Sequence, residues 1–151
     1  MTTISVENPR QNDVLELMAQ ADEYALSIYS AEDYHCADIE ALERPGVTVL
    51  VARTEAGVAG MVALVDSGDD GFEIKRMFVA ESQRGRGIAS ELLARLAETA
   101  VAASARSIRL ETGWEQPDAI ALYLKQGYVH IENFGPYVGD ASSVCMEKVL
   151  S

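Results

Sequence analysis

A short glycine-rich turn between two apolar segments carries the clearest chemical potential in this sequence. It reads Ser-Gln-Arg-Gly-Arg-Gly over residues 82–87, with Gly85 and Gly87 separated by one residue. An apolar stripe at helical spacing begins at Ile88, so a helix is expected to start at the second glycine. The backbone N–H groups in the first turn of a helix have no partner within the helix and lie at the positive end of its dipole. The turn is therefore predicted to bind an anion, and phosphate suits it best.

Three known kinds of phosphate-binding turn join a strand to a helix, and their spacing distinguishes them. A P-loop requires Lys-Ser or Lys-Thr after its last glycine, and neither pair follows here. A dinucleotide fingerprint requires a third glycine where this chain has Ser90. The third kind is the pyrophosphate turn of acyl-CoA-dependent N-acetyltransferases: Gln or Arg, two variable residues, Gly, one variable residue, then Gly or Ala. Residues 84–89 match every defined position. This stretch resembles the GNAT superfamily of N-acetyltransferases.

A second stretch, residues 116–128, carries another motif similar to one of this family. It reads QPDAIALYLKQGY, and Gln116 stands where the family has Asn. A longer amide can still donate and accept hydrogen bonds. The resemblance implies acetyl-CoA as co-substrate, no metal, and transfer of the acetyl group to a primary amine of a small molecule or to a peptide N-terminus. A catalytically silent acyl-CoA sensor or interaction module is the alternative.

Acetyl transfer to an amine makes three demands on a site. The amine must lose a proton, the thioester oxygen must be stabilised, and the departing thiolate must be protonated. The resemblance assigns the last role to Tyr123 and the oxyanion to a backbone N–H of the central strand. It implies that the cofactor is bound by Met77, Phe78, Val79, Arg84, Gly85, Arg86, Gly87, Ile88, Ala89, Gln116 and Tyr123.

The general base has three candidates, two carboxylates and one histidine. Glu73 is the first choice, because it lies on the central strand and regular alternation puts it on the same face as Met77. Glu111 at the end of the next strand is second and His35 third. Relay through ordered water stays open, as does a purely structural role for Glu73 beside a neighbouring basic side chain.

The acceptor amine is expected to lie between the irregular segment 29–36 and a late loop around residue 137. Both regions lie outside the cofactor motifs and carry aromatic side chains, which suit a small amine with an apolar part. The predicted acceptor-binding residues are Tyr29, Tyr34, His35, Glu111 and Tyr137. Cys36 and Cys145 lack the spacing of a metal or disulfide motif and have no evident base. Direct attack in a ternary complex is therefore favoured over an acetyl-cysteine route.

Apolar periodicity predicts eleven elements. The links between the strands expected at 47–53, 58–66 and 72–80 are too short for crossovers, so these strands should form an antiparallel meander. The helix expected at 87–104 is a crossover, so the strands on either side of it should be parallel neighbours. The other predicted elements are a strand at 2–6, helices at 12–28, 37–43 and 118–126, and strands at 107–112, 128–134 and 142–149.

The predicted class is α/β (α+β), a mixed and mostly antiparallel sheet of about seven strands with one parallel splayed pair and about four flanking helices. This is the GNAT architecture, and 151 residues suit a single domain. A net charge of −12 argues against nucleic-acid binding, and no apolar run predicts a membrane span or signal peptide. We expect a cytoplasmic protein, and a homodimer formed through an exposed edge strand at 142–149.

Overall fold

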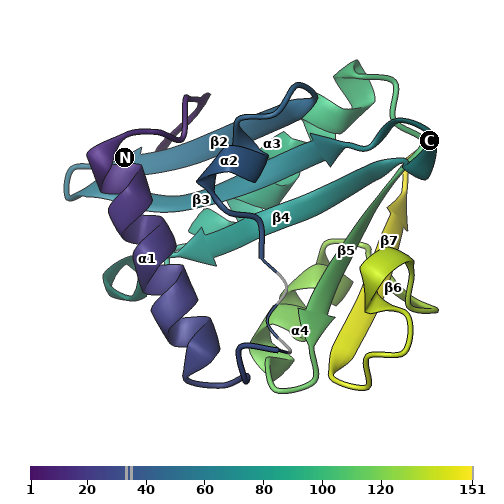
Figure 1. Ribbon diagram of the computed structural model, residues 1–151. Coiled ribbons are helices and arrows are strands. Elements are labelled where there is room, and N and C mark those ends of the chain that lie inside the picture. The colour runs from purple at the N-terminus through teal and green to yellow at the C-terminus, as the bar shows by residue number, and fades with distance from the viewer. Residues whose placement is uncertain (33, 35, 151) are drawn as a thin grey trace.

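The structure is a computed structural model that describes residues 1–32, 34 and 36–150. A seven-stranded mixed sheet runs through it in the order β1-β2-β3-β4-β5-β7-β6, with helices on both faces (Figure 1). The predicted architecture is thereby confirmed. The strands are β1 (Thr3–Val6), β2 (Val47–Thr54), β3 (Gly57–Asp66), β4 (Phe72–Val79), β5 (Ser107–Gly113), β6 (Val129–Ile131) and β7 (Ser143–Val149). The α-helices are α1 (Asn12–Leu26), α2 (Ile39–Leu42), α3 (Ile88–Ala102) and α4 (Pro117–Lys125).

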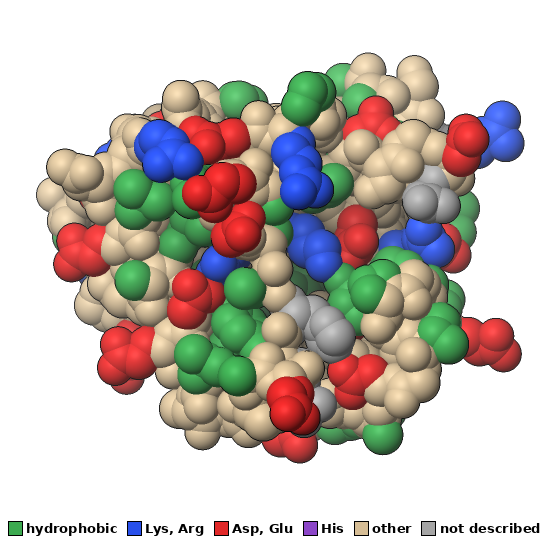
Figure 2. Space-filling view, viewed as in Figure 1, with side chains coloured by type: hydrophobic (Ala, Val, Ile, Leu, Met, Phe, Trp, Pro, Cys, Tyr) green, Lys and Arg blue, Asp and Glu red, His purple; other side chains and the backbone are tan. Residues whose placement is uncertain are grey.

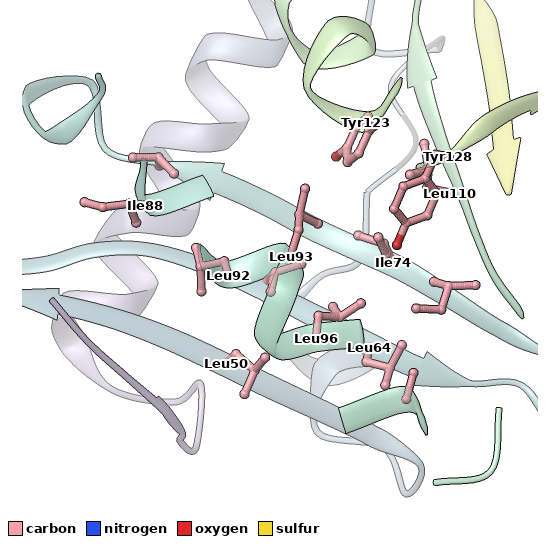
Figure 3. Packing of buried hydrophobic residues seen from close by; sticks show 14 of the residues in the cluster. Leu50, Leu64, Ile74, Ile88, Leu92, Leu93, Leu96, Leu110, Tyr123 and Tyr128 are labelled. Atoms are coloured by element: carbon pink, nitrogen blue, oxygen red, sulfur yellow. The ribbon is translucent and has the colours of Figure 1, made fainter. Parts of the chain in front are cut away.

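Two apolar clusters hold the helices to the sheet. One lies under α3 and α4 and includes Leu92, Leu93 and Leu96, which are fully buried (Figure 3). The other lies under α1 and α2 and includes Val14 and Leu17, at the three-residue spacing of one helix face. Each buried leucine or valine stabilises the fold by about 1.5–3 kcal/mol. Helices therefore cover the sheet on both faces, and their packing holds the strands in fixed positions.

The parallel strands β4 and β5 pair with each other only at their N-terminal ends. Phe72 pairs with Ile108 and Glu73 with Arg109, after which the strands diverge toward their C-terminal ends (Figure 1). The predicted parallel pairing and splay are confirmed. The divergence leaves a gap in the middle of the sheet, and main-chain groups of β4 face it.

A β-bulge interrupts β4 between its two halves. Ala63 of β3 pairs with Lys75, whereas Met61, two residues earlier in β3, pairs with Phe78, three residues later in β4. The extra residue of β4 lies near Arg76, whose φ of 55° is in the left-handed region. Such a bulge reverses the alternation of side chains beyond it.

Because of this bulge, Glu73 and Met77 lie on opposite faces of the sheet. Met77 packs against the cluster under α3 and α4. Glu73 is two residues from Lys75, which lies opposite Ala63 of the α1 and α2 cluster, so Glu73 is on that other face. The prediction that Glu73 and Met77 share a face is wrong, since it assumed an uninterrupted pleat.

The last strand of the chain is not at the edge of the sheet. β7 pairs with β5 along Ser143–Val149 and also with β6, a strand of only three residues that forms the edge. The prediction of an exposed edge at 142–149 is therefore wrong, because β7 inserts between two strands that precede it. The exposed edge strand was the argument for a homodimer, so the homodimer stays a prediction without that support. Among the helices described, none has the length and apolar character needed to span a bilayer.

Candidate active site

A cleft of about 520 Å³ passes through the gap between β4 and β5. Residues of both sheet faces line it, Ala21 and Tyr24 from α1 on one side and Ile88 and Leu122 from α3 and α4 on the other. Figure 2 shows the α1 face, where Lys and Arg side chains gather beside a hollow near the centre. The cleft therefore connects the two faces at the point where the strands separate.

The glycine turn forms one end of this cleft. Gly85 and Gly87 have φ values of 83° and 78°, which side chains rarely adopt, and a Cβ at either would meet no atom within 4 Å. Gly87 precedes α3, and no side chain in the described part of the chain caps the helix start. The helix start therefore lies beside open space at both glycines, and an uncapped helix start with room around it suits a pyrophosphate.

The two arginines of the turn differ in their surroundings. Arg84 lines the cleft, donates from Nε to the carbonyl of Val79 at 3.2 Å, and places its guanidinium 5.4 Å from the ring centres of both Tyr24 and Phe78. Arg86 is exposed and is not among the described residues that line the cleft. Arg84 is consequently the arginine positioned toward a ligand, while Arg86 contributes its charge from outside. The other predicted cofactor positions, which are Met77, Phe78, Val79, Gly85, Gly87, Ile88, Ala89, Gln116 and Tyr123, all line the cleft.

Tyr123 lies on the α4 wall of the cleft and is 6% exposed. Its ring contacts that of Tyr128 edge-on, with centres 5.8 Å apart (Figure 3). Burial raises the pKa of the Tyr123 phenol, and the nearby Tyr128 and Glu111 raise it further. The phenol therefore keeps its proton at neutral pH and is available as a donor.

Gln116 precedes α4 and contacts an aromatic side chain from the other wall. Its Nε2 donates to the hydroxyl of Tyr29 at 3.2 Å, and both residues line the cleft. Burial raises the pKa of Tyr29. The amide thus connects α4 to the segment that follows α1, a contact that the resemblance did not predict.

A partly buried cluster of Glu73, Lys75 and Tyr137 lies beside the cleft. The Tyr137 hydroxyl donates to Glu73 Oε2 at 2.7 Å, and Lys75 Nζ contacts the same hydroxyl and lies 3.1 Å from Glu73 Oε2. Tyr137 is 1% exposed, and burial followed by the Glu73 carboxylate raises its pKa. Of the three, only Lys75 is among the described residues that line the cleft. Glu73, predicted as the general base, and Tyr137, predicted to bind the acceptor, both contact Lys75 and are not among the described residues that line the cleft.

Two other predicted acceptor residues do reach the cleft. Glu111 lines it from β5 and accepts a hydrogen bond from Ser143 Oγ at 2.7 Å. Tyr34 lines it and donates to Asp22 Oδ1 at 2.6 Å. His35 lies outside the described residues. Glu111 and Asp118 are thus the carboxylates that line the cleft in the described part of the chain, and Glu111 is the less exposed of the two.

The comparisons with known proteins decide the family. Residues 12–128 match the model of the acetyltransferase (GNAT) family. An IAA acetyltransferase of Azospirillum brasilense is 41% identical over 149 residues, which is 98% of this chain and 97% of that protein.

The chain belongs to the GNAT family. Its fold agrees with solved structures of lower identity. A GNAT-family acetyltransferase of Staphylococcus aureus superposes with a TM-score of 0.82 at 18% identity, over all of both chains. A Bacillus subtilis acetyltransferase in complex with CoA gives 0.75 at 18% identity, again over all of both chains. This protein is accordingly an acetyltransferase.

Arg76 is a site residue of this GNAT protein that the sequence analysis missed. Its side chain is 5% exposed, its Nη1 donates to Asp22 Oδ1 at 2.6 Å, and its Nε donates to the carbonyl of Ala37 at 2.6 Å. It lines the cleft and ties the bulge in β4 to α1 and to the segment before α2. A signal existed, because Lys75 and Arg76 place two adjacent positive charges within a strand that also carries Glu73, and buried charges require partners.

Proposed function

We propose that this acetyltransferase moves the acetyl group of acetyl-CoA to a primary amine of a small molecule by direct attack in a ternary complex. The observation that carries the proposal is the cleft through the β4–β5 gap. It joins the glycine turn at one end to Tyr123 and Glu111 in its interior. A phosphate-binding turn, a neutral phenol and a carboxylate in one cleft are the groups that this reaction needs.

In the proposed reaction the amine nitrogen forms a bond to the thioester carbon, and the carbon–sulfur bond breaks. Tyr123, whose buried phenol is protonated at neutral pH, gives its proton to the departing thiolate as that charge develops. Glu111, directly or through water, takes the proton that the amine releases. Main-chain N–H groups of β4 at the gap stabilise the oxyanion.

Cys36 offers a second route, because it is exposed and lines the cleft. An acetyl-cysteine intermediate would require this thiol, whereas direct attack would not. Cys36→Ala should therefore leave the rate of transfer within about twofold, and no acetyl group should be found on the protein after incubation with acetyl-CoA alone. Loss of transfer in Cys36→Ala would reject direct attack.

The test of the whole proposal is an acetyl-CoA turnover assay over a panel of amines. IAA, which the Azospirillum brasilense relative carries in its name, is assayed beside the amine panel as a separate compound. We expect CoA release that depends on the amine, and CoA binding by calorimetry. CoA binding without transfer to any amine would instead support a silent acyl-CoA sensor.

A further inference from the structure

Lys75 lines the cleft with its cation and contacts one half-buried partner, Glu73, and one buried partner, Tyr137. Its side chain is 23% exposed, that of Glu73 is 17% exposed, and Tyr137 is almost fully buried. The Nζ atom also lies 5.0 Å from the centre of the Tyr137 ring. A lysine on a flexible stem is ordinarily mobile, but these contacts restrict it to one position.

We propose that Lys75 binds a carboxylate of the acceptor, so that the acceptor is an amino acid with an apolar or aromatic side chain. The inference rests on the proposed function and specifies its acceptor. An ammonium group has three donors. The contacts that the described part of the chain gives Lys75 are with Tyr137 and Glu73, which leave one donor for a ligand.

The position of Lys75 separates it from the phosphate-binding end of the cleft. It lies in the first half of β4, before the bulge and on the α1 face, whereas the glycine turn follows the end of β4. The other two basic side chains that line the cleft in the described part of the chain already have partners or lie at the turn. Arg76 is bound to Asp22 and Ala37, and Arg84 lies at the turn. Lys75 is thus the cation suited to the acceptor rather than to the pyrophosphate.

Glu111 complements Lys75 from the opposite strand of the gap. It lines the cleft from β5, while Lys75 lines it from β4, and the phenols of Tyr29 and Tyr34 lie in the same cleft. An α-amino acid carries its amine and its carboxylate on the same carbon, and in the proposed pose the amine faces Glu111 and the carboxylate faces Lys75. Charge-assisted hydrogen bonds of this kind discriminate strongly, and the rings suit an apolar side chain.

Tyrosine, tyrosine methyl ester and tyramine form the test set. The ester keeps an α-amine of lowered pKa but has no carboxylate, so it separates recognition of the charge from easier deprotonation of the amine. We expect kcat/KM for tyrosine to exceed that for both others at least tenfold. Lys75→Met should abolish this preference by raising the KM for tyrosine at least tenfold, with the KM for acetyl-CoA and the values for tyramine within twofold. Lys75→Arg should retain part of the preference for tyrosine.

Calorimetric titration of tyrosine and its ester into the CoA-bound protein gives a second readout that needs no turnover. Equal binding of the two, or binding of neither, would overturn the proposal, as would equal losses for tyrosine and tyramine in Lys75→Met. Failure of acetyl transfer to every amine would instead count against the proposed function. Lys75→Met leaves Glu73 without its cation, so the Lys75→Met/Glu73→Gln double variant is measured beside it, with the same loss of preference expected.

Discussion

The hydroxyl of Tyr29 lies over Gly113 at the end of β5. A Cβ on Gly113 would stand 1.7 Å from that oxygen, and Gln116 donates to the same hydroxyl. The glycine is needed here for space, because Tyr29 occupies the volume that any side chain would fill. Tyr29 in this way joins the end of the α1 region to the start of α4 across the cleft.

Gly113→Ala should displace Tyr29 and weaken acceptor binding. Overpacking of this kind costs about 1–3 kcal/mol, so the melting temperature should fall by several degrees. We expect the KM for the acceptor to rise at least fivefold while that for acetyl-CoA changes less than twofold. Steady-state kinetics and thermal unfolding measure the two effects.

The double variant Gly113→Ala/Tyr29→Ala tests the cause. With the ring removed, the new methyl group meets no clash, so its effect on stability should largely disappear and the two substitutions should be strongly non-additive. Additive losses of stability would show that Gly113→Ala acts through the backbone of β5 and not through Tyr29.

Gly87→Asp should weaken CoA binding by placing a side chain and a negative charge beside the start of α3. The affinity for CoA should fall at least tenfold, about 1.4 kcal/mol, by calorimetry. Gly68→Asp is the matched control, since Gly68 also has a positive φ of 66° and open space around its Cβ position but does not line the cleft. The two variants should lose similar stability. A CoA affinity that is unchanged in Gly87→Asp would exclude the turn as the phosphate site.

The parts of the site that the sequence predicted are contiguous in the chain. The glycine turn lies between a strand and a helix, and the second motif lies on a helix. Both kinds of element can be predicted from the spacing of apolar residues. The turn, Gln116 and Tyr123 consequently reach one cleft as expected. The meander and the parallel crossover follow from loop lengths in the same way.

What the sequence could not show depends on contacts between distant segments. The bulge lies at Arg76, whose partners Asp22 and Ala37 are distant in the chain, and the alternation of residues within β4 does not indicate it. The bulge places Glu73 opposite to its expected face. Likewise, the order β5-β7-β6 depends on which strand pairs better with β5, which periodicity does not encode.

The ion pair of Arg53 and Glu7, which do not line the cleft, should make the free energy of unfolding depend on pH in acid. Arg53 donates to both carboxylate oxygens of Glu7, at 2.8 and 3.0 Å, and lowers the pKa of Glu7 from 4.5 to about 2. A lowered pKa in the folded state gives stability that is complete above the unfolded value of 4.5 and is lost as pH falls toward 2. Glu7→Gln should therefore cost about 1.5–3 kcal/mol at pH 7, and the difference from wild type should shrink below pH 4.5.

Urea unfolding at several pH values measures this difference. Glu55→Gln is the control, because Glu55 pairs with the N-terminal ammonium where both groups are exposed, and such pairs contribute little. A cost of Glu7→Gln that stays constant between pH 7 and pH 2 would show that the carboxylate charge is not its source.

The neighbouring phenols of Tyr123 and Tyr128 allow a matched test of the proposed proton donor. Both are buried, and their rings are in contact, but only Tyr123 lines the cleft. In the described part of the chain the Tyr128 hydroxyl has no hydrogen-bond partner. Removing it should therefore raise the free energy of unfolding by about 1 kcal/mol, because a buried unsatisfied hydroxyl is costly.

Tyr123→Phe keeps the ring and removes the proton that the thiolate would receive. Its kcat should fall about 100-fold, the range for loss of a general acid, with CoA affinity within twofold of wild type. Tyr128→Phe should keep kcat within twofold, since its hydroxyl faces the apolar cluster. Rates measured under single-turnover conditions with a fixed amine distinguish the acetyl-transfer step from product release. Equal rates for wild type and Tyr123→Phe would show that Tyr123 has only a packing role. Equal losses of kcat in Tyr123→Phe and Tyr128→Phe would show that the contact between the two rings, and not proton donation by Tyr123, determines the rate.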